Sequence, residues 1–274
     1  MSKVNVNTIE PSTGTDITLG ASGDTITVPS GATIVNSGTA TGFGATLSGS
    51  TNNTVVTVTG ANAMIGEAKL LFDPAKLTIG NASEEDTSIV FDGHAQDYYI
   101  GLDDTDDDLK IGLGSAVGTT AHMVFDETGA ITKPLQPAFL AYASSTTNVT
   151  GDGTIITIVY GNEVFDQGGD YDTTTGIFTA PITGRYIVST TFEFEPDSNH
   201  DTTYGYFISS NRSYPIFWQN PSATESAAGL LDIMGSTVLD MDSGDTVFVR
   251  WLVSGGSKTS DYGTANTFGG YLIC

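Results

Sequence analysis

The sequence predicts an all-β protein, and three observations lead to this prediction. No segment keeps a helical periodicity, whereas many short segments alternate apolar and polar residues with period two. Glycine, at 33 of 274 residues, recurs between these segments together with Pro, Asn and Asp, which favour tight turns. Apolar residues make up 39% of the chain, so a core can form and disorder is a poor interpretation.

The first 60 residues predict short strands that one chain cannot bury alone. Period-two segments occupy Asp16–Gly20, Asp24–Pro29 and Ala32–Val35, with turn residues between them. The only aromatic residue of this region is Phe43. Two interpretations stay open, a disordered segment and an extended segment shared between chains. The regular strand pattern favours the second.

Residues 61–133 contain a loose internal repeat. Phe-Asp follows aliphatic residues at Leu71–Pro74, Ile89–Gly93 and Met123–Asp126, and the pair Ile-Gly occurs four times in the same region. Short strands that end in the same turn chemistry indicate a shaft rather than a globule. Such a unit leaves an apolar face that neighbouring repeats or chains must cover.

The composition changes after Thr132–Pro137, where two prolines disfavour a continuing strand ladder. Trp218, Trp251 and most of the Tyr and Phe residues follow this boundary. Seven strand-like segments in this part predict a sandwich, jelly roll or barrel. They are Ala138–Tyr142, Thr154–Tyr160, Gly176–Thr179, Arg185–Thr190, Tyr204–Ile208, Thr246–Trp251 and Gly270–Ile273.

Residues 138–274 also carry a spaced motif of aromatic, acidic and glycine residues. Its members are Tyr160, Asp166, Tyr171, Phe178, Gly184 and Tyr186. The spacing resembles the complement-type globular head, a relative of the tumour-necrosis-factor jelly roll, and Phe268–Leu272 resembles the closing strand of that family. The resemblance implies a jelly-roll β-sandwich that assembles as a homotrimer. The motif aromatics would lie in the core or on the three-fold axis, and the core interpretation is favoured.

The N-terminal half resembles structural and tail-fibre proteins of marine tailed phages. Val4–Thr15 is similar to the N-terminus of such proteins, and Asp86–Gly112 is similar to their shaft modules. The resemblance implies a fibre order along the chain. Residues 1–45 would be a virion-attachment segment, residues 46–133 an extended, intertwined β-repeat shaft, and residues 134–274 the jelly-roll tip.

The charge is strongly acidic, with 9 Lys+Arg against 32 Asp+Glu and a net charge of -23. A phosphate backbone would be repelled, so we expect no nucleic-acid partner. We also expect no membrane insertion, because no apolar run reaches about 18 residues. Met1–Asn5 starts without the apolar region of a signal peptide, which predicts a protein made in the host cytoplasm and located in the virion. The acidic surface suits solubility, and divalent-cation binding is the less favoured alternative.

Catalytic patterns are weak, so we expect no enzyme. His94, His122 and His200 stand in no metal-ligand spacing, and neither a nucleophile elbow nor a phosphate-binding loop is present. A depolymerase built on paired carboxylates is the alternative.

No cofactor is required, and calcium is the one ion that two acidic clusters could hold. The candidate ligands are Asp103, Asp104, Asp106 and Asp108 in one run, and Asp242 and Asp245 in another. The first run lacks the central Gly and distal Glu of a helix–loop–helix calcium site. A solvated turn between two strands is therefore its favoured interpretation.

Residues 195–226 are the candidate receptor-binding region. Their mixture of aromatic and amide side chains suits sugars, because a ring stacks on the apolar face of a sugar while polar groups bind its hydroxyls. The candidate residues are His200, Asn211, Arg212, Tyr214 and Trp218. Ordinary loops with Trp218 buried in the sandwich are an equally supported alternative.

Together these features predict a non-enzymatic, homotrimeric tail fibre. Its partners would be other virion proteins, through the N-terminal segment, and a glycan or protein on the host surface. One alternative is a structural decoration or head or tail appendage without a receptor role. The other is a secreted lectin-like protein, which the missing signal peptide disfavours.

Overall fold

The computed structural model describes residues 9–14, 18, 22, 24–25, 27, 46–48, 54–60, 63–73, 75–195, 199–224 and 229–274. The strands predicted within residues 16–35, and most of the predicted attachment segment 1–45, lie outside the described residues. The same holds for residues 196–198 and 225–226 of the candidate receptor-binding region.

The described residues confirm the all-β class. The single helix among them is α1 (Pro221–Thr224), which is four residues long. No helix in the described part has the length and apolar character needed to cross a bilayer. The chain divides into two compact units, residues 1–81 and 82–274.

The first unit contains a small sheet in which β3 is the central strand. Strand β1 pairs with β3 in parallel, whereas β2 and β4 pair with β3 antiparallel. The strands are β1 (Thr46–Ser48), β2 (Thr54–Gly60), β3 (Ala63–Asp73) and β4 (Lys76–Ile79). Val58, Phe72 and Leu77 are exposed on this sheet, so the unit has no closed apolar core of its own in the described residues.

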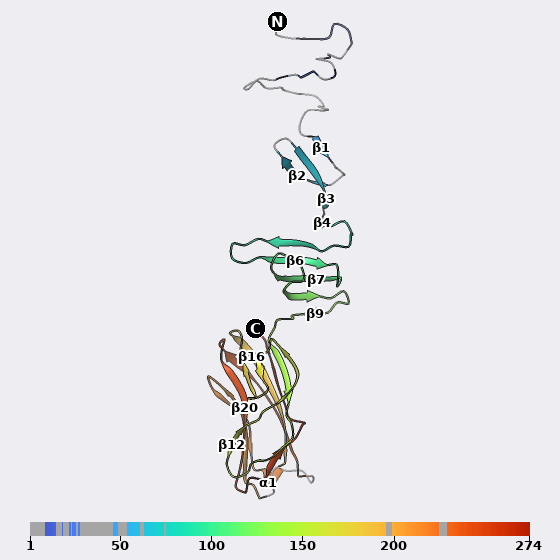
Figure 1. Ribbon diagram of the computed structural model, residues 1–274. Helices are drawn as coiled ribbons and strands as arrows, with labels where there is room; N and C mark the ends of the chain where they lie inside the picture. Colours follow the sequence, from blue (N-terminus) through green and yellow to red (C-terminus); the bar gives the residue numbers. More distant parts are fainter. Residues whose placement is uncertain are drawn as a thin grey trace. The chain divides into compact units, whose positions relative to one another are not determined.

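The second unit begins with an antiparallel meander, hereafter the five-stranded sheet (Figure 1). Its strands are β5 (Thr87–Phe91), β6 (Tyr98–Asp103), β7 (Asp108–Leu113), β8 (Ala121–Phe125) and β9 (Ile131–Thr132). Connections of four to seven residues join neighbours in the order of the chain. Between β8 and β9, Gly129 has a φ of 98° and donates its N–H to the Asp126 carbonyl, a conformation that glycine adopts without strain.

Residues 138–274 form a sandwich of two antiparallel sheets, whose strands run side by side in Figure 1. The seven-stranded sheet contains β10 (Ala138–Tyr142), β11 (Thr146–Thr150), β13 (Asn162–Gln167), β16 (Gly184–Glu195), β19 (Leu231–Met241), β21 (Ser260–Tyr262) and β22 (Thr267–Leu272). The six-stranded sheet contains β12 (Ile155–Thr157), β14 (Tyr171–Asp172), β15 (Ile177–Thr179), β17 (Thr202–Ser209), β18 (Ser213–Gln219) and β20 (Thr246–Ser254).

An aromatic core fills the space between these two sheets. The ring of Phe139 stacks on Tyr171 and Phe178, with centroids 4.9 and 4.7 Å away, and meets Phe268 edge to face at 5.0 Å. Alternate residues of each strand point inward, so both sheets contribute rings to one cluster. This cluster holds the sandwich together by apolar burial.

The spaced motif of the sequence lies in and around this core. Tyr160, Tyr171, Phe178 and Tyr186 are buried. Asp166 accepts the backbone N–H of Tyr171 at 2.9 Å. The remaining member, Gly184, lies where an added Cβ would come within 2.7 Å of the Cys274 carbonyl oxygen. The aromatic members therefore occupy core positions within a single chain.

Candidate functional site

The outward face of the six-stranded sheet carries aromatic side chains where polar ones would be expected. On β17, Thr203 and Phe207 point inward and are buried, so Tyr204, Tyr206 and Ile208 point outward. The same alternation on β20 buries Val249 and Trp251 and turns Phe248 and Arg250 outward. One face of two neighbouring strands is therefore apolar and accessible.

Strand pairing brings these side chains together into one hollow, hereafter the aromatic groove. Tyr206 lies opposite Arg250 across β17 and β20, and Tyr204 lies opposite Trp218 across β17 and β18. The groove has a volume of about 290 Å³. Its lining residues are Ile155, Tyr204, Tyr206, Ile208, Ser213, Trp218 and Arg250.

The rings in the groove form walls rather than a stack. Trp218 is 71% exposed, and its ring lies 5.8 Å from that of Tyr204 with the planes at 55°. Tyr204 and Tyr206 meet at 88° with centroids 5.4 Å apart. Gly205 between them has no room for a side chain, since an added Cβ would come within 2.5 Å of the Phe217 ring. The glycine lets the core pack closely beneath the two tyrosines.

Arg250 supplies positive charge to the groove. Its guanidinium lies 5.5 Å from the centre of the Phe248 ring, a cation–π arrangement. Within the described part of the chain, Arg250 forms no ion pair. Nor do the Tyr204 and Tyr206 hydroxyls or the Trp218 indole N–H find a hydrogen-bond partner among the described residues. These polar groups are therefore free to bind a ligand.

Only one of the predicted receptor-binding residues, Trp218, lines the groove, so the alternative that it is buried is wrong. Tyr214 is half-buried against the core, and Arg212 lies 5.4 Å above its ring. The Asn211 amide donates to the Asp245 carboxylate at 2.6 Å and fixes the turn before β18. None of these three residues lines the groove, although Ser213 between Arg212 and Tyr214 does.

His200 is a correction to the predicted site, because its side chain is buried. Its Nε2 lies 2.9 Å from the Ser257 carbonyl oxygen, and its Nδ1 lies 3.3 Å from the Ser260 hydroxyl. An added Cβ on Gly151 or Gly256 would come within 2.6 and 2.5 Å of the imidazole. The histidine therefore fills a tight internal space and presents nothing to a receptor.

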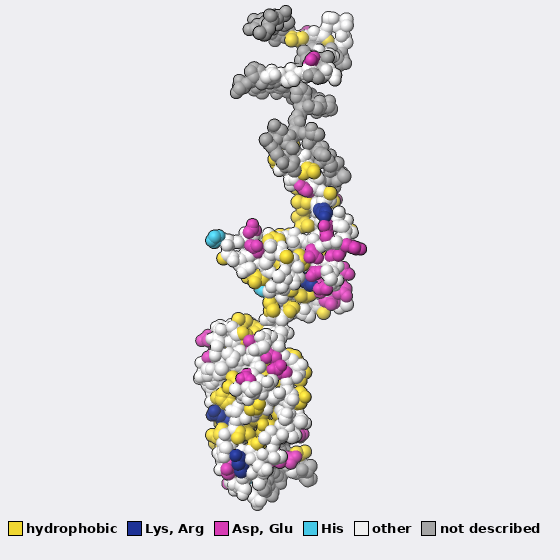
Figure 2. All heavy atoms as spheres, viewed as in Figure 1, with side chains coloured by type: hydrophobic (Ala, Val, Ile, Leu, Met, Phe, Trp, Pro, Cys, Tyr) yellow, Lys and Arg dark blue, Asp and Glu magenta, His cyan; other side chains and the backbone are white. Residues whose placement is uncertain are grey.

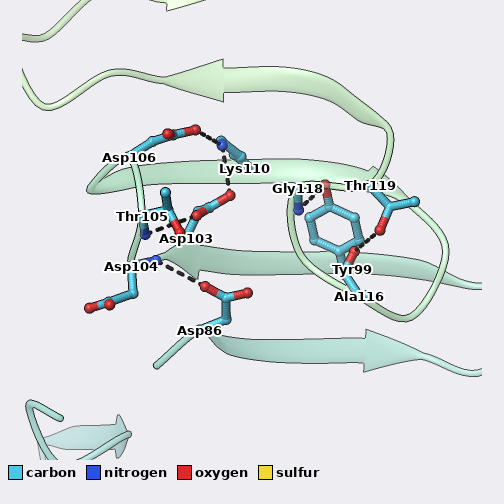
Figure 3. Close-up of polar contacts among 10 residues, drawn as sticks. All are labelled: Asp86, Tyr99, Asp103, Asp104, Thr105, Asp106, Lys110, Ala116, Gly118 and Thr119. Carbon is cyan, nitrogen blue, oxygen red and sulfur yellow. Dashed lines mark hydrogen bonds and ion pairs between the residues drawn. The ribbon is translucent and has the colours of Figure 1, made fainter. Parts of the chain in front are cut away.

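Two aspartates of the acidic run between β6 and β7 pair with a lysine of β7 (Figure 3). The Lys110 ammonium donates to the Asp103 carboxylate at 2.7 Å and also to the Asp106 carboxylate. The hydrogen bond from Lys110 lowers the pKa of Asp103, and the two carboxylates raise the pKa of Lys110. Asp103 and Asp106, two of the candidate calcium ligands, therefore bind Lys110 in this structure, and the run forms the turn between two strands that the sequence favours.

The other two members of that run point elsewhere. Asp104 is exposed, and its backbone N–H donates to the Asp86 carboxylate at 3.0 Å (Figure 3). Asp108 lies beside Asp126 and Glu127, with carboxylate oxygens within 4.8 Å of one another. Figure 2 shows acidic side chains gathered at one end of the five-stranded sheet. The four aspartates are therefore not brought together.

The second acidic cluster closes a turn between β19 and β20. Asp245 accepts the backbone N–H of Asp242 at 2.9 Å in addition to the Asn211 amide, and Gly244 between them has a φ of 93°. The Asp242 carboxylate accepts the Thr183 hydroxyl at 3.5 Å. Both carboxylates therefore accept hydrogen bonds that hold this turn.

Two further faces of unit 2 expose apolar side chains. On the seven-stranded sheet, a hollow of about 210 Å³ is floored by Leu140, Phe165, Ile187 and Tyr271. Phe165 and Tyr271 are exposed there. On the five-stranded sheet, one face is apolar across all five strands. In Figure 2 hydrophobic side chains also gather over the middle of the sandwich, with Lys and Arg near them.

Comparisons with known proteins identify the fold of the sandwich. Residues 138–273 match the family model described as "C1q domain". Similar solved structures include the globular domain of zebrafish complement 1qA protein, with 22% identity, coverage of 51% of this chain and 98% of that chain, and a TM-score of 0.38. Murine APRIL at pH 8.5 is 11% identical, with coverage of 50% and 99% and a TM-score of 0.35. Comparison with curated proteins finds no match.

Residues 138–273 are therefore a C1q/TNF-like jelly-roll domain, which confirms the resemblance to the complement-type head. Domains of this type are binding modules that assemble as trimers, and they are typically not enzymes. The groove residues Tyr204, Tyr206 and Arg250 were absent from the sequence prediction. The sequence signal for them was that apolar residues occupy both faces of β17, since Tyr204, Tyr206 and Ile208 lie on one face and Phe207 lies on the other.

Proposed function

We propose that this protein is a non-enzymatic, homotrimeric tail fibre of a tailed-phage virion. Residues 134–274 would be the tip that binds the host surface, residues 46–133 the shaft, and residues 1–45 the attachment to other virion proteins. The observation that carries this proposal is the open apolar face of the five-stranded sheet, because one chain leaves it in water.

This face consists of three cross-strand rows of apolar side chains. Ile89, Ile100, Ile111 and Met123 lie directly opposite one another in the central row. Phe91, Tyr98 and Leu113 form one flanking row, and Leu102, Leu109, Phe125 and Ile131 form the other. Seven of these eleven side chains are exposed, including Phe91 at 57% and Ile131 at 60%. A contiguous patch of this kind on a soluble protein marks an interaction surface.

The opposite face of the same sheet is the covered one. Tyr99 is fully buried there, and its hydroxyl accepts the backbone N–H of Gly118 at 3.1 Å (Figure 3). An added Cβ on Gly101 would meet Val117 at 2.6 Å, so the loop before β8 presses onto the sheet. The chain therefore covers the polar face and leaves the apolar face open. Copies of the same sheet from other chains would complete the missing layer.

The sandwich supports the same assembly. Its C1q/TNF-like domain is of a trimeric type, and the exposed Phe165 and Tyr271 on the seven-stranded sheet suit an interface between chains. The phage assignment itself is supported by the likeness of Val4–Thr15 and Asp86–Gly112 to phage structural proteins. A glycan or protein of the host surface would be the external partner, with the virion as the location.

The native mass of the full chain tests the assembly. Light scattering after size exclusion should give three times the chain mass of 28.5 kDa. A monomer would overturn the proposal, since the open face would then stay in water. For the virion role, the purified chain should label or block host cells, and antibodies against it should decorate virions. Decoration without cell binding would favour a structural subunit without a receptor role.

A further inference from the structure

We propose that the aromatic groove binds an acidic sugar residue of a surface polysaccharide, one that carries a carboxylate as uronic acids do. The inference deepens the proposed function and rests on it for the source of the ligand, since the tip domain would meet polysaccharide on a cell surface. The side chains that line the groove support this ligand independently of that source.

The floor and walls of the groove suit a sugar ring. A pyranose has an apolar face of C–H groups and a rim of hydroxyls. The Trp218 ring is 71% exposed, and together with the Tyr204 ring it offers apolar walls on which that face could be buried. The planes of these two rings meet at 55°, so the rings form the sides of a hollow rather than a flat surface.

Polar groups stand around the apolar walls in the positions that a hydroxyl rim requires. The hydroxyls of Tyr204 and Tyr206 and the indole N–H of Trp218 have no hydrogen-bond partner among the described residues. Each can therefore exchange water for a sugar hydroxyl without breaking a hydrogen bond within the described part of the protein. A volume of about 290 Å³ lies near the lower end of small-ligand sites and suits one or two sugar rings.

The charge selects an anionic sugar. Residues 134–274 contain 4 Lys+Arg against 15 Asp+Glu, so most of this surface repels anions. Arg250 lines the groove, is held over Phe248 and has no carboxylate partner in the described part of the chain. A planar guanidinium binds a carboxylate through two parallel hydrogen bonds. An acidic sugar could therefore pair its carboxylate with Arg250 while its ring packs against Tyr204 and Trp218.

The experiment measures binding of the full chain to two probes, oligogalacturonate and its methyl ester, which has the same sugar rings but an uncharged methyl ester in place of each carboxylate. Titration calorimetry should show oligogalacturonate binding about tenfold more tightly, the contribution of one charge-assisted contact. Arg250→Met should remove this preference, Arg250→Lys should restore part of it, and Trp218→Ala should abolish binding of both probes. Lys258→Met removes one exposed positive charge of the same domain outside the groove and is the matched control, for which we expect wild-type binding.

Several outcomes would overturn the inference. Equal affinity for the two probes, no binding of either, or an equal loss in Lys258→Met and Arg250→Met would each exclude a specific acidic-sugar site.

Adsorption to host cells separates this inference from the proposed function. If the Trp218→Ala trimer adsorbs to host cells as well as the wild type does, the fibre function is supported and the groove is not the site that binds the cell. A chain that binds oligogalacturonate but not host cells keeps the groove and excludes the receptor role. Adsorption that protease treatment of the cells abolishes would make the groove a protein-docking surface.

Discussion

The five-stranded sheet and the sandwich are built from the same alternating strands, yet they bury opposite faces. In the sandwich, apolar side chains such as Tyr160, Trp251 and Phe268 point toward a second sheet and are fully buried. In the five-stranded sheet, the apolar rows point away from the covered face, where Lys110 and Asp103 lie instead.

This difference shows what alternation alone specifies. A period-two pattern sets which residues share a face of a sheet, but it does not supply the layer that covers the face. The sandwich contains both layers in one chain, so its aromatic core is buried without a second chain. The five-stranded sheet lacks its second layer, so burial of its apolar rows should depend on association of chains.

The largest expected effect is a truncation in the sandwich core. Phe268 contacts the rings of Phe139, Tyr160, Tyr171 and Phe207. Phe268→Ala should lower the free energy of unfolding by about 3–5 kcal/mol, because it leaves a cavity among these rings. Denaturant unfolding monitored by Trp fluorescence measures the change, since both tryptophans lie in the sandwich. The same loss is expected at every protein concentration; a loss that varied with concentration would contradict the intrachain core.

A charge on the open face of the five-stranded sheet should have the next largest effect. Ile100→Asp would place a carboxylate at the centre of the apolar rows, where a covering chain would have to bury it unpaired at a cost of several kcal/mol. Hydrogen exchange of peptides from residues 98–113 should become much faster. Ser115→Asp adds the same charge at an exposed loop position and should change nothing. Unchanged exchange in Ile100→Asp would show that the face is open to water in the assembled protein.

The fold could be predicted from the sequence further than the site could. The all-β class follows from the strand pattern, and the sandwich follows from the many aromatic residues after Pro137, which are enough to form a core. The groove depends on which strands pair: Tyr206 meets Arg250 only because β17 and β20 are neighbours, although they are far apart in the sequence. Trp218 could be singled out because an aromatic residue among amides is visible without pairing.

The roles of the acidic run and of His200 depend on contacts that the sequence does not show. The aspartates between β6 and β7 were also considered as calcium ligands, but the turn points Asp103 and Asp106 toward Lys110 and places Asp108 beside Asp126. His200 looked accessible because its neighbours are polar, but two distant glycines, Gly151 and Gly256, make space for its ring in the interior. In both cases a contact between distant parts of the chain decides the role of the side chain.

A smaller effect is expected on the covered face of the five-stranded sheet. Lys110→Met would leave Asp103 nearly buried without its cation, and the loss should be about 1–3 kcal/mol at pH 7, as for other hydrogen bonds to charged groups. The hydrogen bond from Lys110 holds the pKa of Asp103 below its ordinary value of 3.8, so the pair stabilises the folded state fully above that value and loses this contribution as the pH falls from it through the lowered pKa. The difference in Tm between wild type and Lys110→Met should therefore be constant near neutral pH and shrink as the pH falls below about 4. A difference that stayed constant from neutral pH to well below pH 3.8 would show that the ion pair is not its source.

The smallest effect on stability is expected at the groove, and it distinguishes a ligand site from an interface between chains. Ile100 and Trp218 are both exposed apolar residues in one chain, at 38% and 71%. If the groove is an unoccupied ligand site, Trp218→Ala removes only surface contacts with Tyr204. The free energy of unfolding should then change by no more than about 0.5 kcal/mol. The variant keeps Trp251 as its single tryptophan, so fluorescence then reports the buried core alone. A large fall in Tm, or a lower native mass, would place the groove between chains. An unchanged Tm and mass, with binding of the acidic sugar lost, would show that exposure on the six-stranded sheet serves recognition, whereas exposure on the five-stranded sheet serves assembly.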